Sequence, residues 1–138
     1  MLAQVHSPET LGPAELDFYL QMGWFRMGQT IFTTNFLSFK NQLYSALWLR
    51  VFLPEFTTDK TREKLIKLNA SFATEIRRAS LNPATENLFK EYRKSVSFEA
   101  SSSIHQLLYG KSALDIYNTY EVNLYDDGKL IACGFFDL

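Results

Sequence analysis

The sequence predicts an α/β (α+β) domain in which helices flank a mostly antiparallel, twisted sheet. Three observations lead to this fold class. Helix-type and strand-type segments follow one another in the order α-β-β-α-(β)-α-α-β-β, where the segment in brackets fits either a strand or a helix. Two alternating runs, 116–124 and 129–138, flank Asp126-Asp127-Gly128, and Asp-Gly between such runs is a strong hairpin signal. Finally, 138 residues with 46% hydrophobic content are enough chain for one core.

The composition defines one domain and excludes several kinds of site. Residues 1–11 are polar and aperiodic, which predicts a disordered lead-in before a single domain over 12–138. The one cysteine, Cys133, excludes an internal disulfide and a multi-cysteine zinc site, and no metal or cofactor is expected. The sequence has no apolar run of membrane-spanning length and no signal-peptide pattern. We therefore expect a cytoplasmic protein without a membrane partner.

The first third of the chain reads as one helix and two strands. Gly12-Pro13 opens a short amphipathic helix that ends at Gly23. Alternating aromatic and β-branched residues predict a strand over 24–35, followed by a loop over 36–42. A second strand is expected over 43–52, and because both of its faces are apolar, we place it inside the sheet.

The middle of the chain is mainly helical. N-cap candidates at 57–59 begin a helix that runs to about Asn69. Residues 72–78 fit either a short strand or a bent continuation of that helix. Asn82-Pro83 opens the next helix, over 84–94, with Leu88, Phe89 and Tyr92 expected on its inner side. A Ser-rich loop over 95–103 leads to a brief helix over 104–109, which Gly110 closes.

Charge is unevenly distributed although the net charge is only -1. Residues 50–94 carry ten Lys or Arg and six Asp or Glu, whereas residues 95–138 carry two and six. Four of the cations lie in the predicted helix after Asp59: Lys60, Arg62, Lys64 and Lys67. A charge run on a helix is usually its solvated face, but this one also fits a patch for phosphate groups.

Several short motifs occur together in a characteristic order. They are Gly23-Trp24-Phe25-Arg26-Met27-Gly28, Leu49-Arg50-Val51 continuing through Phe56 to the basic helix, Phe89-Lys90-Glu91-Tyr92-Arg93, and Gly128-Lys129-Leu130-Ile131-Ala132 through Phe136-Asp137. In this order and spacing, from about residue 14 to 138, the chain resembles the arginyl- and leucyl-tRNA–protein transferase family.

The resemblance implies a fold, an activity and a set of site residues. The fold would be the acyl-CoA N-acyltransferase-like fold of the GCN5-related enzymes. The activity would be transfer of arginine or leucine from aminoacyl-tRNA to the N-terminus of an acceptor protein or peptide, with the charged tRNA as co-substrate. The four cations of the basic helix would bind tRNA phosphate. Asp137 would be the catalytic candidate, and Arg26, Arg50, Tyr92 and Arg93 would bind substrate or serve the structure.

The chain also departs from the family's pattern. The family's cysteine pairs, read as a metal-binding element, have no counterpart in the matching loop over 35–47. The family continues beyond the position of Asp137, so the fold is expected to be incomplete at the C-terminus, either as the first part of a longer domain or as a reduced relative. A terminal strand with a free edge predicts a homodimer through that edge. Two alternatives stay open: a CoA-dependent N-acetyltransferase-like enzyme, and a non-catalytic RNA- or protein-binding module of the same fold.

Overall fold

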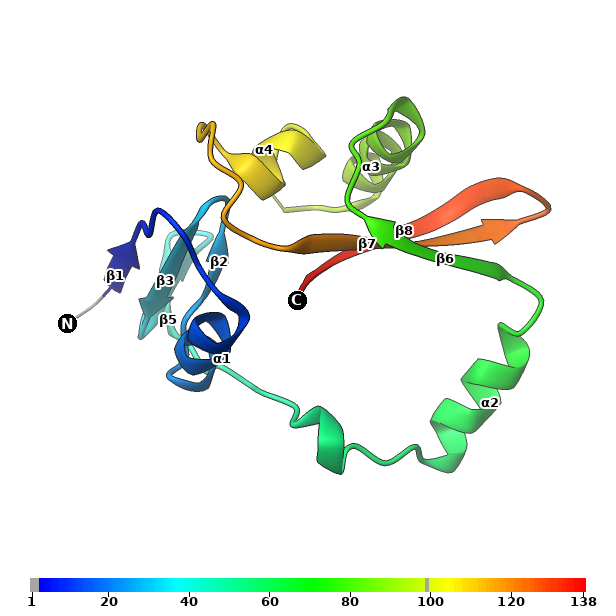
Figure 1. Cartoon of the computed structure of the whole chain (residues 1–138), viewed down its shortest axis with the longest axis horizontal. Coiled ribbons are helices and arrows are strands. Elements are labelled where there is room, and N and C mark those ends of the chain that lie inside the picture. Colours follow the sequence, from blue (N-terminus) through cyan, green and yellow to red (C-terminus); the bar gives the residue numbers. More distant parts are fainter. Residues whose placement is uncertain (1–2, 99) are drawn as a thin grey trace. The chain divides into compact units, whose positions relative to one another are not determined.

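The structure is a computed structural model that describes residues 3–98 and 100–138 (Figure 1). It is a mixed α/β chain with antiparallel sheets, and the described residues form four α-helices. Contacts group the chain into two compact units, one of Met1–Arg50 with His105–Tyr117 and one of Val51–Ile104 with Asn118–Leu138. Among the described residues, no helix combines the length and apolar character needed to cross a bilayer.

The first unit contains a three-stranded antiparallel sheet in the order β1-β3-β2. Its strands are β1 (Ala3–His6), β2 (Phe25–Met27) and β3 (Thr30–Thr34). Gly28, at φ 61°, starts the two-residue turn between β2 and β3, a conformation that glycine adopts without steric strain. Helix α1 (Pro13–Gln21) packs against this sheet through Leu16, which shares a buried cluster with Ile31 and Tyr117.

A separate two-stranded ribbon completes the first unit. Strand β4 (Phe36–Phe39) pairs with β5 (Gln42–Ser45), and every residue of both strands is exposed. The two-residue turn at Lys40 and Asn41 has φ of 49° and 59°, the left-handed conformation of tight hairpin turns. We call residues 36–45 the aromatic hairpin, because Phe36, Phe39 and Tyr44 lie on it.

The second unit contains an antiparallel sheet in the order β6-β7-β8, with α3 lying over one face (Figure 1). The strands are β6 (Ala73–Arg78), β7 (Thr119–Asp126) and β8 (Lys129–Asp137). The remaining elements are the 3₁₀ turn η1 (Leu53–Glu55) and the helices α2 (Lys60–Leu68), α3 (Pro83–Ser95) and α4 (Ile104–Tyr109). Helix α4 belongs to the first unit, except for its first residue, Ile104.

The C-terminal hairpin confirms the prediction made from Asp126-Asp127-Gly128. Asp126 pairs with Lys129, and the two turn residues between them have φ of 46° and 77°. The helices predicted after Gly12 and Asp59 are also confirmed, as is the one after Asn82. Residues 72–78, left open between strand and helix, are strand β6.

Predictions for the first 52 residues are wrong at four places. The expected lead-in contains strand β1. This strand pairs with β3 through backbone hydrogen bonds, which do not require alternating apolar side chains. The strand expected over 24–35 is two strands, because Gly28 reverses the chain. The loop expected over 36–42 contains β4. The strand expected inside a sheet over 43–52 ends at Ser45, since no described strand pairs with the residues that follow.

Candidate functional site

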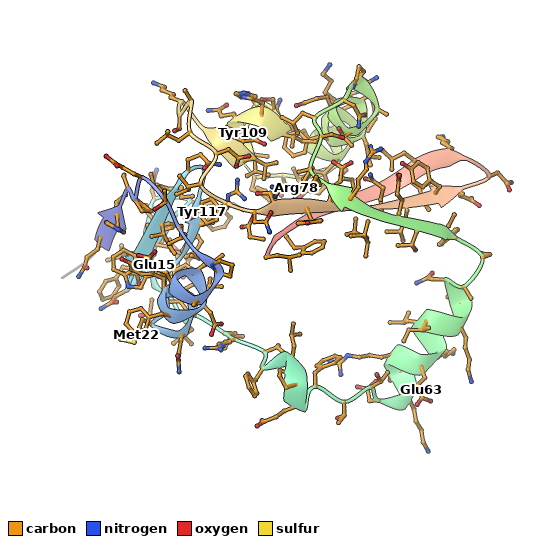
Figure 2. All side chains as sticks on the ribbon, viewed as in Figure 1. Glu15, Met22, Glu63, Arg78, Tyr109 and Tyr117 are labelled. Atoms are coloured by element: carbon orange, nitrogen blue, oxygen red, sulfur yellow. The ribbon has the colours of Figure 1, made fainter. Side chains whose placement is uncertain are left out.

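Three lysines lie along one face of α2. Lys60, Lys64 and Lys67 are spaced i, i+4 and i+7, a spacing that places them within one helical stripe. All three are exposed, and within residues 3–98 and 100–138 none of them forms an ion pair. Figure 2 shows side chains standing out around α2, among them the labelled Glu63. We call these three residues the lysine stripe; they form a cationic surface that no ion pair among the described residues neutralises.

Arg62 does not belong to the lysine stripe. Its guanidinium lies 3.5 Å from the Asp59 carboxylate and 4.6 Å from the centre of the Phe56 ring. The Asp59 side chain also accepts a hydrogen bond of 2.8 Å from the Arg62 backbone N–H and so caps the helix. Arg62 is thus engaged at the first turn, and the structure separates it from the lysines with which the sequence grouped it.

The apolar residues of α2 are also exposed. Leu65, Ile66 and Leu68 have exposed fractions of 51%, 64% and 71%, and no residue of the helix is buried. The helix therefore owes its formation to local features: the Asp59 cap, Glu63 in the first turn, and Lys67 in the last turn, where a cation favours the helix dipole.

Asp137 lies at the end of β8 and is partly buried. Its Oδ1 accepts a hydrogen bond of 2.7 Å from the Thr119 hydroxyl, and Thr119 itself is buried and directly opposite on β7. The carboxylate is therefore held by Thr119 and is not free in solvent. This bond does not test the catalytic role expected for Asp137, which stays a prediction.

Arg26 anchors the first unit. Its Nε donates to the Gly28 carbonyl at 2.8 Å, and a terminal nitrogen donates to the Leu108 carbonyl at 2.7 Å. The guanidinium also lies 4.3 Å from the centre of the Tyr117 ring. These contacts join the β2–β3 turn to the end of α4.

The other arginine of the first unit differs from Arg26. Arg50 lies outside any strand, contrary to the sequence prediction, because pairing ends at Ser45. It lies 3.4 Å from the Asp17 carboxylate on α1, and the two side chains are 38% and 68% exposed. An exposed pair of this kind contributes about 0.5 kcal/mol.

Tyr92 and Arg93 lie on the outer part of α3. Tyr92 has an exposed fraction of 48%, so the prediction that it faces inward is wrong; its ring stacks on that of Phe89 instead, with centroids 6.0 Å apart. The inward positions near this end are taken by Leu88 and Phe89, which are half-buried. Arg93 donates to the Ser102 carbonyl at 3.0 Å and holds the chain that follows the helix.

A buried polar cluster on β7 was not predicted from the sequence. Glu121 and Asn123 are completely buried, and they lie on the same sheet face because they are two residues apart. Glu121 accepts hydrogen bonds from Arg77 Nε at 2.5 Å, from the Ser80 backbone N–H at 3.1 Å and from Asn123 Nδ2 at 3.0 Å. Asn123 Oδ1 is the buried side-chain oxygen that has no partner in the described part of the chain.

The cluster is built to hold a charge and not to transfer a proton. Burial alone opposes ionisation of Glu121, but the hydrogen bonds from Arg77, Ser80 and Asn123 outweigh it and lower the pKa of the carboxyl. A carboxylate with a lowered pKa is a weak base at neutral pH. Burial, followed by the negative charge of Glu121, raises the pKa of the Cys133 thiol to about 11, so this thiol stays protonated and unreactive.

A signal for this cluster was present but ambiguous. Residues 119–124 alternate polar and apolar, which predicts a strand but does not say which face is buried. The usual interpretation would bury the face that carries Tyr120, Val122 and Leu124. Here Thr119, Glu121 and Asn123 are buried because α3 and its lead-in cover their side of the sheet, where the Ser80 N–H binds Glu121.

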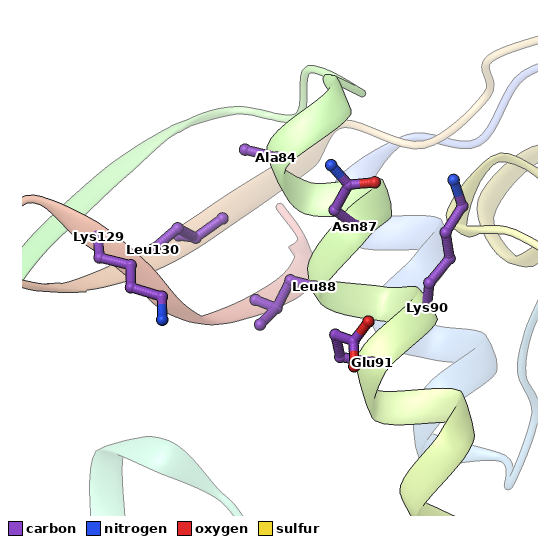
Figure 3. A pocket seen from close by; sticks show the side chains of 7 residues that line it. All are labelled: Ala84, Asn87, Leu88, Lys90, Glu91, Lys129 and Leu130. Atoms are coloured by element: carbon purple, nitrogen blue, oxygen red, sulfur yellow. The ribbon is translucent and has the colours of Figure 1, made fainter.

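A groove of the second unit lies between α3 and the β7–β8 hairpin (Figure 3). It has a volume of about 360 Å³ and is lined by Ala84, Asn87, Leu88, Lys90, Glu91, Lys129 and Leu130. Its charged groups are mostly cationic and none of them is a predicted site residue. Over residues 3–98 and 100–138, no group of three or more His, Cys, Asp or Glu side chains is arranged to hold a metal ion.

Comparisons of the chain with family models, curated proteins and solved structures find no match. The resemblance noted from the sequence therefore depends on its own motifs, their order and their spacing.

Proposed function

We propose that this chain is an aminoacyl-tRNA–protein transferase-like domain and that the lysine stripe of α2 binds the tRNA backbone. The observation that carries the proposal is the set of three exposed, aligned and unpaired lysines, Lys60, Lys64 and Lys67. A phosphate backbone presents regularly spaced negative charges, and each phosphate contact releases bound counterions. The sequence resemblance, which covers this helix, gives tRNA as the polyanion.

The chemistry of such a transfer makes small demands on side chains. The ester of aminoacyl-tRNA is already activated, so the domain has to place an acceptor α-amine beside it and accept a proton. In this proposal the Asp137 carboxylate holds the α-amine at the end of β8. Arg62 supports the helix at its first turn and does not touch the tRNA, because its contacts are to Asp59 and Phe56.

A binding module without catalysis is the second candidate. It is favoured by one observation: the buried carboxylate of the second unit, Glu121, is fully hydrogen-bonded with a lowered pKa, so it is not a proton acceptor at neutral pH. This candidate keeps the tRNA contact of the lysine stripe and omits the transfer step.

The first experiment measures tRNA binding as a function of salt. The variant Lys60→Gln/Lys64→Gln/Lys67→Gln should bind several-fold more weakly at low salt, and the slope of log affinity against log salt should fall by about 2–3. A matched variant, Lys90→Gln/Lys111→Gln/Lys129→Gln, removes the same charge elsewhere and should change the slope by less than about 1. Equal slopes for the two variants would reject the lysine stripe as the binding surface.

The second experiment separates transfer from binding. Charged tRNA and a peptide with a free N-terminus are incubated with the protein, and the peptide mass is followed. Addition of the amino acid, lost in Asp137→Asn with tRNA affinity unchanged, supports the transferase. Salt-sensitive tRNA binding without any mass change supports the binding module instead.

A further inference from the structure

The aromatic hairpin, residues 36–45, has two side-chain faces that differ in chemistry. Directly paired residues share a face of an antiparallel ribbon, and the pairs are Leu37 with Tyr44 and Phe39 with Gln42. Leu37, Phe39, Gln42 and Tyr44 therefore form one face, which we call the Phe39 face. Phe36 and Leu43 lie on the other side of the ribbon.

The rings on the Phe39 face are open to a ligand. Phe39 and Tyr44 have exposed fractions of 49% and 47%, and neither ring packs against another aromatic ring in the described part of the chain. The two tryptophans of this region have partners within the first unit: Trp24 packs on its core, while Trp48 contacts Phe25.

The polar groups around these rings are donors and a cation. The Lys40 ammonium lies 5.3 Å from the centre of the Phe39 ring, at the tip of the hairpin. The Tyr44 hydroxyl donates to Gln42 Oε1 at 2.7 Å, a bond that engages the acceptor oxygen of the Gln42 amide and not its two N–H donors. No acidic residue occurs between Asp17 and Glu55, a stretch that includes the whole hairpin.

This combination has a specific chemical match. An apolar protein partner or a second copy would use the rings but would gain nothing from the absence of acids. Unpaired nucleotides offer π-faces to stack on exposed aromatic rings and phosphates that a lysine attracts, and this pairing is how single strands are bound without a sequence requirement. Bases inside a duplex are stacked on one another and cannot use the rings.

We propose that the Phe39 face binds unpaired RNA nucleotides, with Phe39 and Tyr44 as stacking platforms and Lys40 as the phosphate contact. The choice of RNA rests on the proposed function; the stacking chemistry does not. Within that function the hairpin would take a single-stranded part of the RNA, while the lysine stripe takes backbone phosphate.

The test uses the full chain and a labelled single-stranded RNA of roughly a dozen nucleotides, a typical site size, beside a duplex of the same sequence. Phe39→Ala/Tyr44→Ala should weaken single-strand binding about tenfold or more and change duplex binding less than about twofold. The control Phe36→Ala/Leu43→Ala removes a ring and a leucine from the other face and should change single-strand binding less than about twofold.

A measurement on the unchanged protein guards against variants that disturb folding. Single-stranded RNA carrying 5-bromouracil is irradiated on the protein, and the cross-linked peptide is identified by mass spectrometry. A cross-link at Phe39 or Tyr44 supports the inference. Cross-links confined to other segments, or equal losses in the two double variants, overturn it.

The outcomes also separate this inference from the proposed function. If the variant lacking the lysine stripe binds tRNA normally while the hairpin cross-links, the proposed contact of α2 fails and the hairpin site stands. If tRNA binding depends on the lysine stripe but the hairpin neither cross-links nor responds to substitution, only the hairpin site fails. Binding of the protein to anionic phospholipid vesicles through Phe39 and Tyr44, without single-strand binding, would assign the face to lipid and overturn the inference.

Discussion

Helices α2 and α3 belong to the same unit and are coded in similar ways, yet only α3 is packed. Each begins at a side-chain cap, Asp59 or Asn82, and each has at least one basic residue in its last turn. Each also carries two or three apolar residues at helical spacing. Helix α3 buries Thr85 and lies against β8, whereas α2 buries nothing.

The chain that enters each helix accounts for this difference. Immediately before α3, the Ala79 N–H donates to the Thr119 carbonyl at 3.0 Å and the Ser80 N–H donates to Glu121 at 3.1 Å. These bonds hold the start of α3 on the sheet. Before α2, by contrast, the backbone N–H groups of Glu55 and Phe56 donate within the turn of η1, and Asp59 accepts from the helix that it caps. Local signals therefore form a helix, and bonds to the sheet decide whether it is packed.

Removing the Glu121 side chain should have the largest effect on the difference between α2 and α3, because it releases the start of α3 from the sheet. Glu121→Ala leaves Arg77 and the Ser80 N–H without their acceptor and strands the buried Asn123 amide. We expect the free energy of unfolding to fall by about 3 kcal/mol, mainly because the Ser80 N–H and the buried Asn123 amide lose their acceptor. Urea denaturation with an unchanged m-value measures this loss.

Glu75 provides the matched control for that experiment. It also contacts Arg77, at 3.7 Å, and accepts from the Tyr125 hydroxyl, but its side chain is 47% exposed. Glu75→Ala should therefore lower the free energy of unfolding by less than about 1 kcal/mol. Equal losses for the two variants would show that burial of Glu121 is not what holds α3.

The pH dependence of stability tests the same cluster with a smaller effect. The pKa of Glu121 is lowered from its ordinary value of 4.5, so the folded state binds fewer protons than the unfolded state in this range. Its contribution is thus complete above pH 4.5 and is lost as the pH falls below it, through the folded-state pKa. Glu121→Gln should be less stable than the wild type by about 2 kcal/mol at pH 7.

The diagnostic result is how that difference changes in acid. Urea midpoints measured from pH 7 downward should converge for Glu121→Gln and wild type below pH 4.5. A constant difference across the range would mean that the charge of Glu121 contributes nothing and that only the shape of its side chain matters.

Two hairpin turns show how much of the fold the sequence reveals. Asp127-Gly128 and Lys40-Asn41 both have positive φ at both residues, and both connect strands directly. The first was predicted, since glycine adopts this conformation at no cost and rarely occurs there by chance. The second is not predicted, because lysine gives no such signal and the sequence predicts only a loop over 36–42. Residue propensities identify turns whose residues readily adopt positive φ. They do not identify turns in which pairing of the flanking strands places less favourable residues at positive φ.

The candidate site divides in the same way. The lysine stripe follows from helical spacing alone, so the sequence predicted Lys60, Lys64 and Lys67 as one group. That Arg62 contacts the Asp59 cap and the Phe56 ring depends on where the preceding chain runs. The aromatic hairpin became a candidate only after the register placed Phe39 on one exposed face, since a run of aromatic residues by itself indicates a core.

Removing a helix cap should have the smallest effect on stability, and it compares α2 and α3 directly, because each helix has one side-chain cap. Asn82 accepts hydrogen bonds from the backbone of Ala84 and Thr85, and the Thr85 hydroxyl closes the box. Because α3 is part of the packed unit, Asn82→Ala should lower the free energy of unfolding by about 1 kcal/mol. Asp59→Ala removes the corresponding bond from α2 but should shift the urea midpoint of the sheet by an amount equivalent to less than about 0.5 kcal/mol.

Hydrogen exchange distinguishes local from global loss in these two variants. In Asp59→Ala, the amide of Arg62, which donates to Asp59 in the wild type, should exchange faster while amides of β7 keep their protection. In Asn82→Ala, the amides of β7 should lose protection together with those of α3, since both report unfolding of one unit. If Asp59→Ala also lowered protection in β7, α2 would be energetically coupled to the sheet despite its exposed surface, and the contrast between the two helices would be wrong.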